Sequence, residues 1–447
     1  MGDAVDIRAG RLTPAEYDAN FDELYPPLDR KRALVEASRC YFCHDAPCVE
    51  ACPTSIDIPR FIRGIHTDNV AGAATTILEA NIMGGACARV CPTEILCEGA
   101  CVRTAQENKP VKIGLLQRYA TDHLLESGTQ PFTRAAPTGQ RIAVVGAGPA
   151  GLACAHALAR DGHDVVVFEK RPKGGGLNEY GIAAYKVPHG FAQKEVEFIL
   201  GVGGIELRCG VALGRDIHLR DLRREFSAVF IGVGLGGVNV LGLPGEELAG
   251  VHNAVDYIAR LRQADPASLP VGHDVVVIGG GNTAIDIAVQ SRRLGATNVT
   301  IAYRRGASQM GATRHEQEVA QTNGVTIRHW TRPVRLIGED DHVRAVELEY
   351  TQLGQTGRLM GTDDRFTLRA DMVFKAIGQH LVPSALDGSV DLLEIERGKI
   401  KVNEDRMSSL DRVWAGGDAI GQGQDLTVQA VEDGKIAARA IHRYLMD

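Results

Sequence analysis

Over its last three quarters the chain repeats one hydrophobic pattern: a short apolar run, a glycine turn and a longer amphipathic stretch. From Arg141, RIAVVGAGPAGLACAHALARDGHDVVVFEK contains an apolar strand, a turn, an alanine-rich helix and a second apolar strand. The same order returns from His273 in HDVVVIGGGNTAIDIAVQSRRLGATNVTIAYRRG. Shorter apolar runs in AVFIGVGLG, MVFKAIGQ and RVWAGGD end at glycines, and residues 430–447 have the spacing of a final amphipathic helix. This pattern predicts an α/β protein with two Rossmann-like units.

The first unit has glycines where a bound pyrophosphate needs them. Gly146 permits the tight turn, Gly148 lets a pyrophosphate approach the backbone, and Gly151 lets helix and strand pack closely. Glu169 ends the second strand, 18 residues after Gly151, where an acid can accept hydrogen bonds from ribose hydroxyls. The unit is therefore predicted to bind a dinucleotide.

The second unit differs at the end of its second strand. Gly279, Gly281 and Ala284 take the three small positions, but the strand ends at Arg304 and Arg305 instead of an acid. An acid holds a ribose 2′-hydroxyl, whereas arginines accommodate a 2′-phosphate. The arginines favour NADP(H) over NAD(H), and a solvated turn is the alternative explanation for them.

A late apolar strand runs into Gly416, Gly417 and Asp418, and a helix follows after Thr427. Two dinucleotide units followed by such a turn are typical of two-domain pyridine-nucleotide flavoproteins. There the first unit holds FAD, a nicotinamide domain is inserted, and the chain returns to complete the flavin domain. Asp418 is then expected near the flavin ribityl chain and pyrophosphate, with an ordinary turn aspartate as the alternative.

Eight of the ten cysteines lie in the first quarter of the chain. The remaining two, Cys154 and Cys209, form no CxxC pair, so a redox disulfide beside a flavin is not expected. The eight occur as two runs, CYFCHDAPCVEACP with Cys40, Cys43, Cys48 and Cys52, and CARVCPTEILCEGAC with Cys87, Cys91, Cys97 and Cys101.

The composition and the amino-terminal sequence predict that these cysteines are in a reducing compartment. The 447 residues are 44% hydrophobic and 23% charged, which suits a soluble chain of about three domains. A net charge of −7 gives no basic footprint for nucleic acid, and the amino terminus has no apolar signal core. The uncharged run 142–159 is long enough for a membrane span, but glycines and a proline interrupt it where a strand would meet a helix. We expect a cytoplasmic protein whose clustered thiols bind metal.

The spacing of the cysteines favours iron–sulfur clusters. A CxxC that continues into further cysteines and ends in Cys-Pro is close to the bacterial ferredoxin run, whose last cysteine ligates the other cluster. Structural zinc usually shows two separated CxxC pairs or mixed Cys and His ligands. Zinc and a disulfide scaffold stay as alternatives to two [4Fe–4S] clusters. The ferredoxin rule assigns Cys40, Cys43, Cys48 and Cys101 to one cluster and Cys52, Cys91, Cys97 and a fourth ligand, on pattern alone Cys87, to the other.

The segments CYFCHDAPCVEACPTSIDIPRFI, ACARVCPTEILCEGAC, VGAGPAGLACA, GGGNTAIDIA and WAGGD follow one another as in the amino-terminal half of dihydropyrimidine dehydrogenase. The chain resembles that family from about residue 25 to its end, and it is also similar to the small subunit of glutamate synthase. The DAPC stretch, the CPTSIDIPRFI continuation and Gln117 favour the first resemblance. It implies an α-helical iron–sulfur domain at 1–135, an FAD domain at 136–242 and 380–447, and an NAD(P)H domain at 243–379.

The resemblance also assigns cofactor residues and makes Gln117, in place of Cys87, the fourth ligand of the second cluster. One departure is that the family's third arginine around the 2′-phosphate falls on Gly311, with Arg314 as a substitute, so NAD(H) stays possible. The implied FAD residues are Gly146, Gly148, Pro149, Ala150, Gly151, Glu169, Lys170, Gly176, Leu177, Lys186, Leu213, Gly417, Asp418 and Thr427. The implied NAD(P)H residues are Gly279, Gly280, Gly281, Asn282, Thr283, Arg304, Arg305, Arg314, Ala376, Ile377 and Gly378.

Cofactor chemistry sets the expected order of electron flow. Nicotinamide gives up two electrons together as hydride, an iron–sulfur cluster takes one at a time, and a flavin can do both. The resemblance implies transfer from NAD(P)H through FAD and two clusters to a separate FMN-containing, iron–sulfur catalytic subunit that reduces pyrimidines. No residue of this chain is expected to act as a catalytic acid or base.

The expected assembly is a cytoplasmic hetero-oligomer with neither nucleic acid nor membrane as a partner. The alternatives are the small subunit of glutamate synthase, a related electron-transfer flavoprotein, and a non-enzymatic iron–sulfur regulatory protein.

Overall fold

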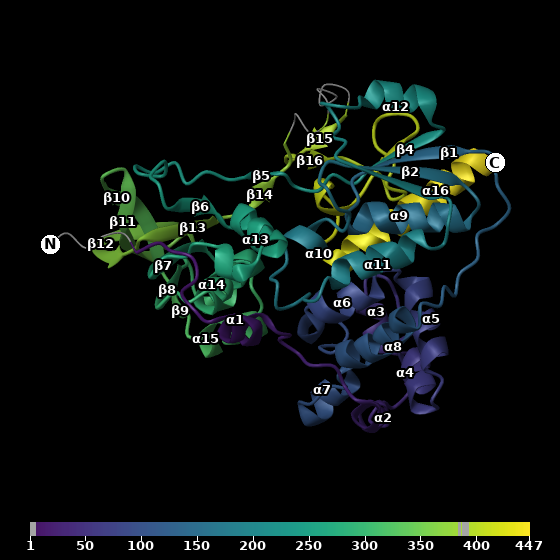
Figure 1. The fold of residues 1–447 in the computed structure, drawn as a ribbon, viewed down its shortest axis with the longest axis horizontal. Helices are drawn as coiled ribbons and strands as arrows, with labels where there is room; N and C mark the ends of the chain where they lie inside the picture. Colours follow the sequence, from purple (N-terminus) through teal and green to yellow (C-terminus); the bar gives the residue numbers. More distant parts are fainter. Residues whose placement is uncertain (1–5, 383–385, 387–392) are drawn as a thin grey trace. The chain divides into compact units, whose positions relative to one another are not determined.

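The computed structural model describes residues 6–382, 386 and 393–447 of the chain (Figure 1). It divides into two compact units, each assembled from three chain segments. Unit 1 contains Met1–Leu24, Tyr180–Pro188 and Val238–Gln379, and unit 2 contains Tyr25–Glu179, His189–Gly237 and His380–Asp447. Two of the five passages between the units lie in the short strands β5 (Gly237–Val238) and β14 (Gln379–His380).

Unit 2 is built on a five-stranded parallel sheet of order β17-β4-β1-β2-β3. Its central strands are apolar along most of their length because both faces are covered, whereas the edge strand β3 contains Glu206 and Arg208. Ile142 and Val144 pack toward helices on one face, and Ala143 and Val145 belong to a separate core on the other. The strands are β1 (Arg141–Val145), β2 (Asp164–Glu169), β3 (Ile205–Cys209), β4 (Ala228–Ile231) and β17 (Val413–Ala415), with a small hairpin of β15 (Ile395–Glu396) and β16 (Lys399–Ile400).

Helices cover both faces of this sheet. Figure 1 shows α9, α11 and α16 on one side and α12 on the other. The uncharged run 142–159 is split between β1 and α9, as the glycine turn predicts. Within the described residues no helix has the length and apolar character needed to cross a membrane. These helices are α9 (Pro149–Arg160), α10 (Leu177–Tyr180), α11 (Phe191–Leu200), α12 (Leu219–Glu225), η6 (Gly417–Ala419) and α16 (Thr427–Met446).

The cysteine-rich segment of unit 2 is a group of short helices. Its core is continuous with the core under the sheet, because Ile62, Ile77 and Leu116 belong to the same cluster of buried side chains as Leu152 and Val431. The cluster-binding and flavin-binding regions expected at 1–135 and 136–242 therefore form one compact unit. The helices are α2 (Arg30–Ala37), α3 (Pro47–Glu50), α4 (Ile58–His66), α5 (Val70–Ala80), α6 (Gly84–Val90), η1 (Thr93–Ile95), α7 (Val102–Glu107) and α8 (Ile113–Ser127).

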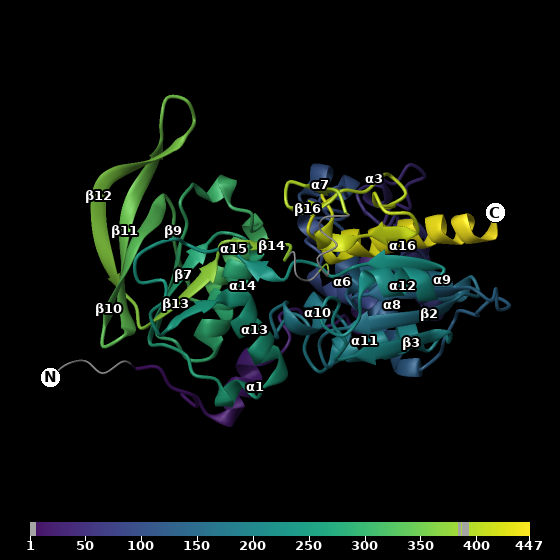
Figure 2. The ribbon, with the colours of Figure 1, turned by 90° about the horizontal axis from the view of Figure 1, so that it is seen from above.

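Unit 1 contains the second parallel sheet, of order β6-β13-β7-β8-β9. Helices pack on one face and an antiparallel sheet, β10-β11-β12, packs on the other (Figure 2). The alternation of side chains along β7 serves both layers, since Val275 and Val277 face the helices and Val276 and Ile278 face the antiparallel sheet.

The remaining element bounds of unit 1 follow chain order. The helices are α1 (Pro14–Phe21), α13 (Ala254–Gln263), η2 (Pro266–Ser268), α14 (Asn282–Arg293), η3 (Ala307–Gln309) and α15 (Arg314–Thr322). The strands are β6 (Val251–Asn253), β7 (Asp274–Gly279), β8 (Asn298–Ala302), β9 (Thr326–Arg328), β10 (Thr331–Glu339), β11 (His342–Leu353), β12 (Leu359–Arg369) and β13 (Met372–Ala376).

The amino-terminal residues were expected with the cysteine-rich helices, and the structure places them in unit 1 instead. Tyr17 of α1 is 5% exposed and belongs to the core of that unit. Asn20 donates to Arg293 O at 3.0 Å, and Arg8 pairs with Val271 in an isolated β-bridge. The architecture as a whole has the predicted α/β fold, with two Rossmann-like units and an α-helical cysteine-rich region.

Candidate functional site

Four cysteines from both runs line one cavity among the short helices of unit 2. Cys40, Cys43 and Cys48 come from the first run, and Cys101, at the start of α7, comes from the second. Burial, followed by the nearby Cys101, Cys40 and Cys43, raises the pKa of Cys48 to about 12. Cys40 Sγ accepts a hydrogen bond from Phe42 N at 3.4 Å. The structure thus brings together the four residues predicted for one cluster.

A second cavity contains the other predicted set. Cys52 from the first run lies with Cys91 and Cys97 from the second, and both candidates for the fourth ligand, Cys87 and Gln117, also line it. A hydrogen bond with Cys87, followed by burial, raises the pKa of Cys91 well above its usual range. Burial first, and then nearby acidic groups, raises the pKa of Cys97. Thiols in such surroundings ionise when a bound cationic centre compensates the buried charge.

Gln117 is held by its amide nitrogen. Nε2 donates to Gly84 O at 2.7 Å, in the helix that carries Cys87, and the side chain is 7% exposed. This hydrogen bond leaves the amide oxygen as the atom that can serve as a ligand in the cavity. Cys87, 2% exposed, competes with it from α6. The sequence predicted both candidates, and both are in place.

The two cavities fit clusters of several metal ions. Four cysteines line each cavity, and cysteine thiolates are the usual ligands of such clusters. Ile58 at the start of α4 lines both cavities, so the two cavities are neighbours. Val428 of α16 lines the second cavity and directly follows Thr427. Sequence reasoning missed Ile58 and Val428, because an apolar helix residue carries no signal of a role beside a cofactor.

The glycine loop after β1 has the backbone that close approach of a pyrophosphate requires. Gly146 has φ 102°, and a Cβ on Gly151 would lie 1.9 Å from Gly146 O. Gly148 is the N-cap of α9 without a side-chain cap, and Pro149 takes the first helical position. Gly176 lies against this turn, since its Cβ would be 2.6 Å from Gly148 Cα. The amino-terminal N–H groups of α9 are therefore open to a phosphate.

Glu169 anchors this loop to the end of β2. Its Oε2 accepts from Ala147 N at 2.8 Å and its Oε1 accepts from Arg171 N at 2.9 Å. The side chain is 7% exposed, and Lys170 beside it is exposed. A carboxylate has further lone pairs, so Glu169 can hold the loop and still accept from ribose hydroxyls.

The late Gly-Asp turn packs onto the same loop. Gly417 has φ 71°, and a Cβ there would lie 3.2 Å from the Cβ of Ala150. Burial raises the pKa of Asp418 to about 6. Thr427 begins α16, and its Oγ1 lies 3.2 Å from Asn178 Oδ1, one residue after the predicted Leu177. These predicted FAD residues converge within unit 2.

Two further predicted FAD residues are Leu213 and Lys186. Leu213 is 7% exposed and packs in the core on the opposite face of the sheet from α9. Lys186 belongs to unit 1, where Nζ lies 2.8 Å from Asp286 Oδ1 and 2.7 Å from Glu316 Oε1. Lys186 is thus held by two carboxylates within unit 1, and its role beside the FAD stays a prediction.

The second glycine loop follows β7 in unit 1. Gly279 has φ 145°, and a Cβ there would lie 2.1 Å from Ala376 O. A Cβ on Gly280 would lie 2.3 Å from the Tyr303 ring, whereas Gly281, the N-cap of α14, has open space around it. Asn282 and Thr283 open α14, and Ile377 and Gly378 follow β13 at the same end of the sheet. The predicted loop residues thus meet at one sheet edge.

The two arginines predicted to hold a 2′-phosphate are exposed after β8. Thr351 Oγ1 donates to Arg304 O at 2.8 Å, and Trp330 N donates to Arg305 O at 3.1 Å, so their backbone is fixed. A Cβ on Gly311 would lie 3.7 Å from Gly281 Cα, beside the glycine loop. Arg314 instead has Nε 3.2 Å from Glu318 Oε1 on its own helix. Arg304 and Arg305 thus follow β8 directly, and the exposed Arg314 forms an ion pair within α15.

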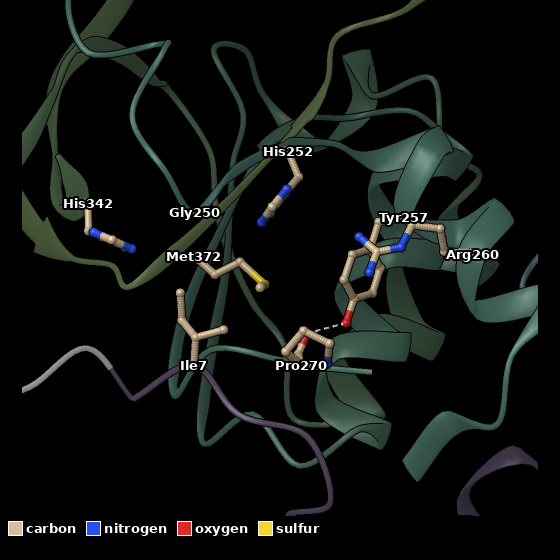
Figure 3. A pocket seen from close by; sticks show the side chains of 8 residues that line it. All are labelled: Ile7, Gly250, His252, Tyr257, Arg260, Pro270, His342 and Met372. Carbon is tan, nitrogen blue, oxygen red and sulfur yellow. Dashed lines mark hydrogen bonds between the residues drawn. The ribbon is translucent and has the colours of Figure 1, made fainter. Parts of the chain in front are cut away.

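A third cavity lies at the other end of the same strands (Figure 3). Gly250 and Met372 line it, at the amino ends of β6 and β13, and Tyr257 Oη donates there to Pro270 O at 2.6 Å. Burial lowers the pKa of His252, which also lines it. The cavity contains none of the predicted nucleotide residues.

Two glycine-loop sheets and a cysteine-rich helical region define the class of an iron–sulfur flavoprotein oxidoreductase. Comparison with known families agrees. Residues 17–129 match the family described as dihydropyrimidine dehydrogenase domain II, 4Fe-4S cluster, and residues 140–434 match the family described as pyridine nucleotide-disulphide oxidoreductase.

Similar whole proteins extend over nearly the full chain. The chain is 37% identical over 424 residues to NAD-dependent dihydropyrimidine dehydrogenase subunit PreT of Escherichia coli K12, covering 95% of this chain and 97% of the relative. It is 34% identical over 465 residues to glutamate synthase [NADPH] small chain of Halomonas elongata, covering 98% and 97%. The chain belongs to the pyridine nucleotide-disulphide oxidoreductase family, together with the dihydropyrimidine dehydrogenase subunits and glutamate synthase small chains to which it is similar.

The fold of the flavoprotein part is also similar to solved structures. FprA of Mycobacterium tuberculosis in complex with NADPH aligns with a TM-score of 0.57 and 21% identity, over 69% of this chain and 85% of that one. The resemblance stated from the cysteine and glycine motifs is therefore confirmed, and so are the oxidoreductase class and the fold.

Proposed function

We propose that this chain is the electron-input subunit of an NAD(P)-dependent dihydropyrimidine dehydrogenase. The observation that carries the proposal is the succession of sites within unit 2. The predicted FAD residue Thr427 is followed by Val428, which lines the second cysteine cavity, and Ile58 lines both that cavity and the first. A flavin held at the glycine loop would supply the chemistry that links the two-electron hydride donation of a nicotinamide to the one-electron transfers of iron–sulfur centres.

The protein's own residues bind and orient these groups. The amino terminus of α9 would hold the FAD pyrophosphate, and Glu169 would hold the ribose. Asp418 and Thr427, from the carboxyl-terminal segment of the same unit, would hold the other side of the cofactor. Cys52, Cys91, Cys97 and Gln117 hold the cluster nearer Val428, and Cys40, Cys43, Cys48 and Cys101 hold the other. Apolar side chains around both cavities exclude water. No acid or base of this chain is needed for hydride transfer.

The proposed partner is a separate FMN- and iron–sulfur-containing subunit that reduces uracil and thymine to 5,6-dihydropyrimidines. The relative that is 37% identical carries the name of a dihydropyrimidine dehydrogenase subunit, and this supports the assignment. We place the complex in the cytoplasm, because its buried thiols need a reducing compartment.

The test uses the purified holoprotein. NAD(P)H should bleach the flavin and support reduction of a one-electron acceptor, whereas uracil should stay unreduced until the FMN-containing subunit is added. Uracil reduction by the isolated chain, or a flavin that NAD(P)H leaves oxidised, contradicts the proposal.

A second candidate is the small subunit of an NADPH-dependent glutamate synthase, favoured by 34% identity over 98% of the chain. Adding a glutamine-using large subunit in place of the FMN-containing one distinguishes the two. Formation of glutamate with that subunit, without uracil reduction with the other, would select this candidate.

The coenzyme is tested by replacing Arg304 and Arg305 with Ala together. Loss of one or two charge-assisted contacts to a 2′-phosphate costs about 1.5–3 kcal/mol each. NADPH turnover with an artificial acceptor should fall at least about tenfold, since about 1.4 kcal/mol is tenfold. NADH turnover should be nearly unchanged. A wild type that already prefers NADH would show that the arginines do not select the coenzyme.

A further inference from the structure

Asn81 places an unpaired amide group in the cavity that Cys52, Cys91 and Cys97 line. The residue is 0% exposed, and its Nδ2 has no hydrogen-bond partner among the described residues. An amide nitrogen carries two N–H donors, and leaving a buried donor unpaired costs about 1–3 kcal/mol. A side chain in this position is therefore expected to have a partner that occupies the cavity.

The other polar atoms of Asn81 are fully used by the turn between α5 and α6. Its backbone N donates to Ile77 O at 2.8 Å, and its O accepts from Gly84 N at 2.9 Å. The side-chain Oδ1 accepts from Met83 N at 3.0 Å. Turning the amide over would set Nδ2 against the Met83 N–H, donor against donor, so the orientation of the amide is fixed. Nδ2 is the atom left to the cavity.

The same turn supports Gln117. Gly84, whose N–H is bound by Asn81 O, accepts the Gln117 Nε2 hydrogen bond through its own oxygen. Asn81 and Gln117 therefore present two amides to one cavity from one backbone turn. Gln117 has its nitrogen bound and its oxygen available, and Asn81 has the reverse. An available oxygen suits a metal, and an available N–H suits an anionic sulfur.

We propose that Asn81 Nδ2 donates an N–H···S hydrogen bond to a cluster or ligand sulfur in this cavity and raises the reduction potential of that cluster. A donor stabilises the more negative, reduced state more than the oxidised state, and hydrogen bonds to the sulfurs are among the factors that set cluster potentials. Asn81 would thus tune the reduction potential of one cluster on the path of the electrons. The inference rests on the proposed function, because it needs a cluster in the cavity.

The test is a redox titration of the holoprotein followed by electron paramagnetic resonance, for the wild type, Asn81→Ser and Asn81→Leu. The serine hydroxyl can still accept from Met83 N–H, so this variant keeps the turn and removes the amide donor, whereas leucine removes both. In both variants one cluster should become harder to reduce by at least about threefold, equivalent to about 28 mV at 59 mV per tenfold change. The other cluster and the FAD content should not change.

Asn69→Ser is the matched control. Asn69 caps the opposite end of α5, where its Oδ1 accepts from Gly72 N at 3.0 Å, and it does not line the cavity. Both cluster potentials should equal those of the wild type in this variant. A cluster that stays oxidised throughout the titration gives no potential. In that case the N–H···S hydrogen bond is tested by the shift of the Fe–S stretching bands between H2O and D2O, which should be smaller in both Asn81 variants because they lack the exchangeable amide donor.

The outcomes separate the two proposals. A wild type with no iron–sulfur clusters overturns the proposed function and this inference together. Full iron content with unchanged potentials and unchanged D2O shifts in both Asn81 variants overturns this inference alone. Loss of iron from both variants also overturns it, because Asn81 would then hold the turn and not tune the cluster.

Discussion

At the scale of single residues, the fourth ligand of the second cluster is the assignment on which pattern and resemblance differ. Cys87 and Gln117 line the same cavity, and both are nearly inaccessible to solvent. Spacing alone favours the thiol. The Gln117 amide is nonetheless oriented for ligation, because Nε2 is held by Gly84 O. An amide oxygen is a harder and neutral ligand, so a cluster with Gln117 carries one less negative charge than a cluster with four thiolates.

Replacing Cys87 with Ser should therefore leave about eight irons per chain, the content of two [4Fe–4S] clusters. Replacing Gln117 with Leu should perturb one cluster while the FAD content holds. Iron and flavin analysis of both purified variants makes the measurement. Loss of about four irons in the Cys87 variant reverses the assignment.

The residues of the candidate site also show how much of it could be predicted from the sequence. The eight cysteines, the glycines of both loops and Glu169 were predictable, because each is demanded by local geometry or chemistry that leaves a mark in spacing. No spacing in the sequence indicates a role for Asn81. Its role depends on which atoms of one turn are already bonded, and that is decided by Met83 and Gly84 in three dimensions.

At the scale of elements, α11 and α6 are joined through a buried carboxyl group. Glu195 of α11 is 1% exposed, and its Oε1 accepts from Ala86 N of α6 at 2.9 Å. Burial raises the pKa of Glu195 to about 7. The folded protein keeps this proton up to about pH 7, whereas the unfolded chain releases it near 4.5. Between these pH values the folded state binds more protons, so its stability falls as pH rises.

Glu195→Gln keeps an acceptor for Ala86 N–H and removes the charge. The free energy of opening of α6 and α11, measured by native-state hydrogen exchange, should rise by up to about 3 kcal/mol at pH 8, since one pKa unit is about 1.4 kcal/mol. The gain should be smaller at pH 5.5. Glu197→Gln, at an exposed position of α11, should change neither value. Equal gains at both pH values would contradict the linkage.

A second buried charge group fixes the segment Tyr180–Pro188 to helices α14 and α15. Lys186 is the cation between the carboxylates of Asp286 and Glu316, with side-chain exposures of 9%, 8% and 18%. Removing one partner of a buried pair leaves uncompensated charge, which costs about 3–5 kcal/mol. The opening free energy of α14 and α15 should fall by about that amount in Lys186→Met, as measured by hydrogen exchange.

Arg335→Ala is the control for that variant. It breaks an ion pair with Glu347 on the antiparallel sheet of the same unit, where the arginine side chain is 55% exposed. Exposed pairs contribute about 0–1 kcal/mol. A loss in Lys186→Met no larger than in this control would mean that the buried group does not hold the segment.

The elements themselves were largely predictable, because their hydrophobic runs and glycine turns act locally. The final helix was expected after Thr427, and it begins at that residue. The assignment of residues 6–24 to unit 1 could not be predicted from local pattern. It depends on contacts of Arg8 with Val271 and of Asn20 with Arg293, which lie more than 260 positions away in the sequence.

At the scale of the whole molecule, unit 1 contains the residues predicted for nicotinamide binding, and unit 2 contains those predicted for the clusters and most of those predicted for the flavin. The insertion of the nicotinamide domain was predicted, and its expected carboxyl boundary at 379 coincides with the end of the Val238–Gln379 segment. The expected boundary between helical and flavin domains is not a division of the structure, since Leu116 and Leu152 lie in one continuous core. Because that core is continuous, loss of a group bound in either cysteine cavity is expected to lower the stability of the parallel sheet of unit 2.

Removal of iron should therefore destabilise unit 2 selectively. A group that binds the folded state and not the unfolded chain stabilises it by mass action, and both cysteine cavities belong to unit 2. In hydrogen exchange of iron-free protein, amides of α8 and β1 should lose protection relative to the iron-loaded protein. Amides of β7 and α14 in unit 1 should keep theirs, because their core contains no residue of either cavity. Equal loss of protection in both units would show that they unfold as one, and unchanged protection in α8 would show that the clusters do not stabilise the fold.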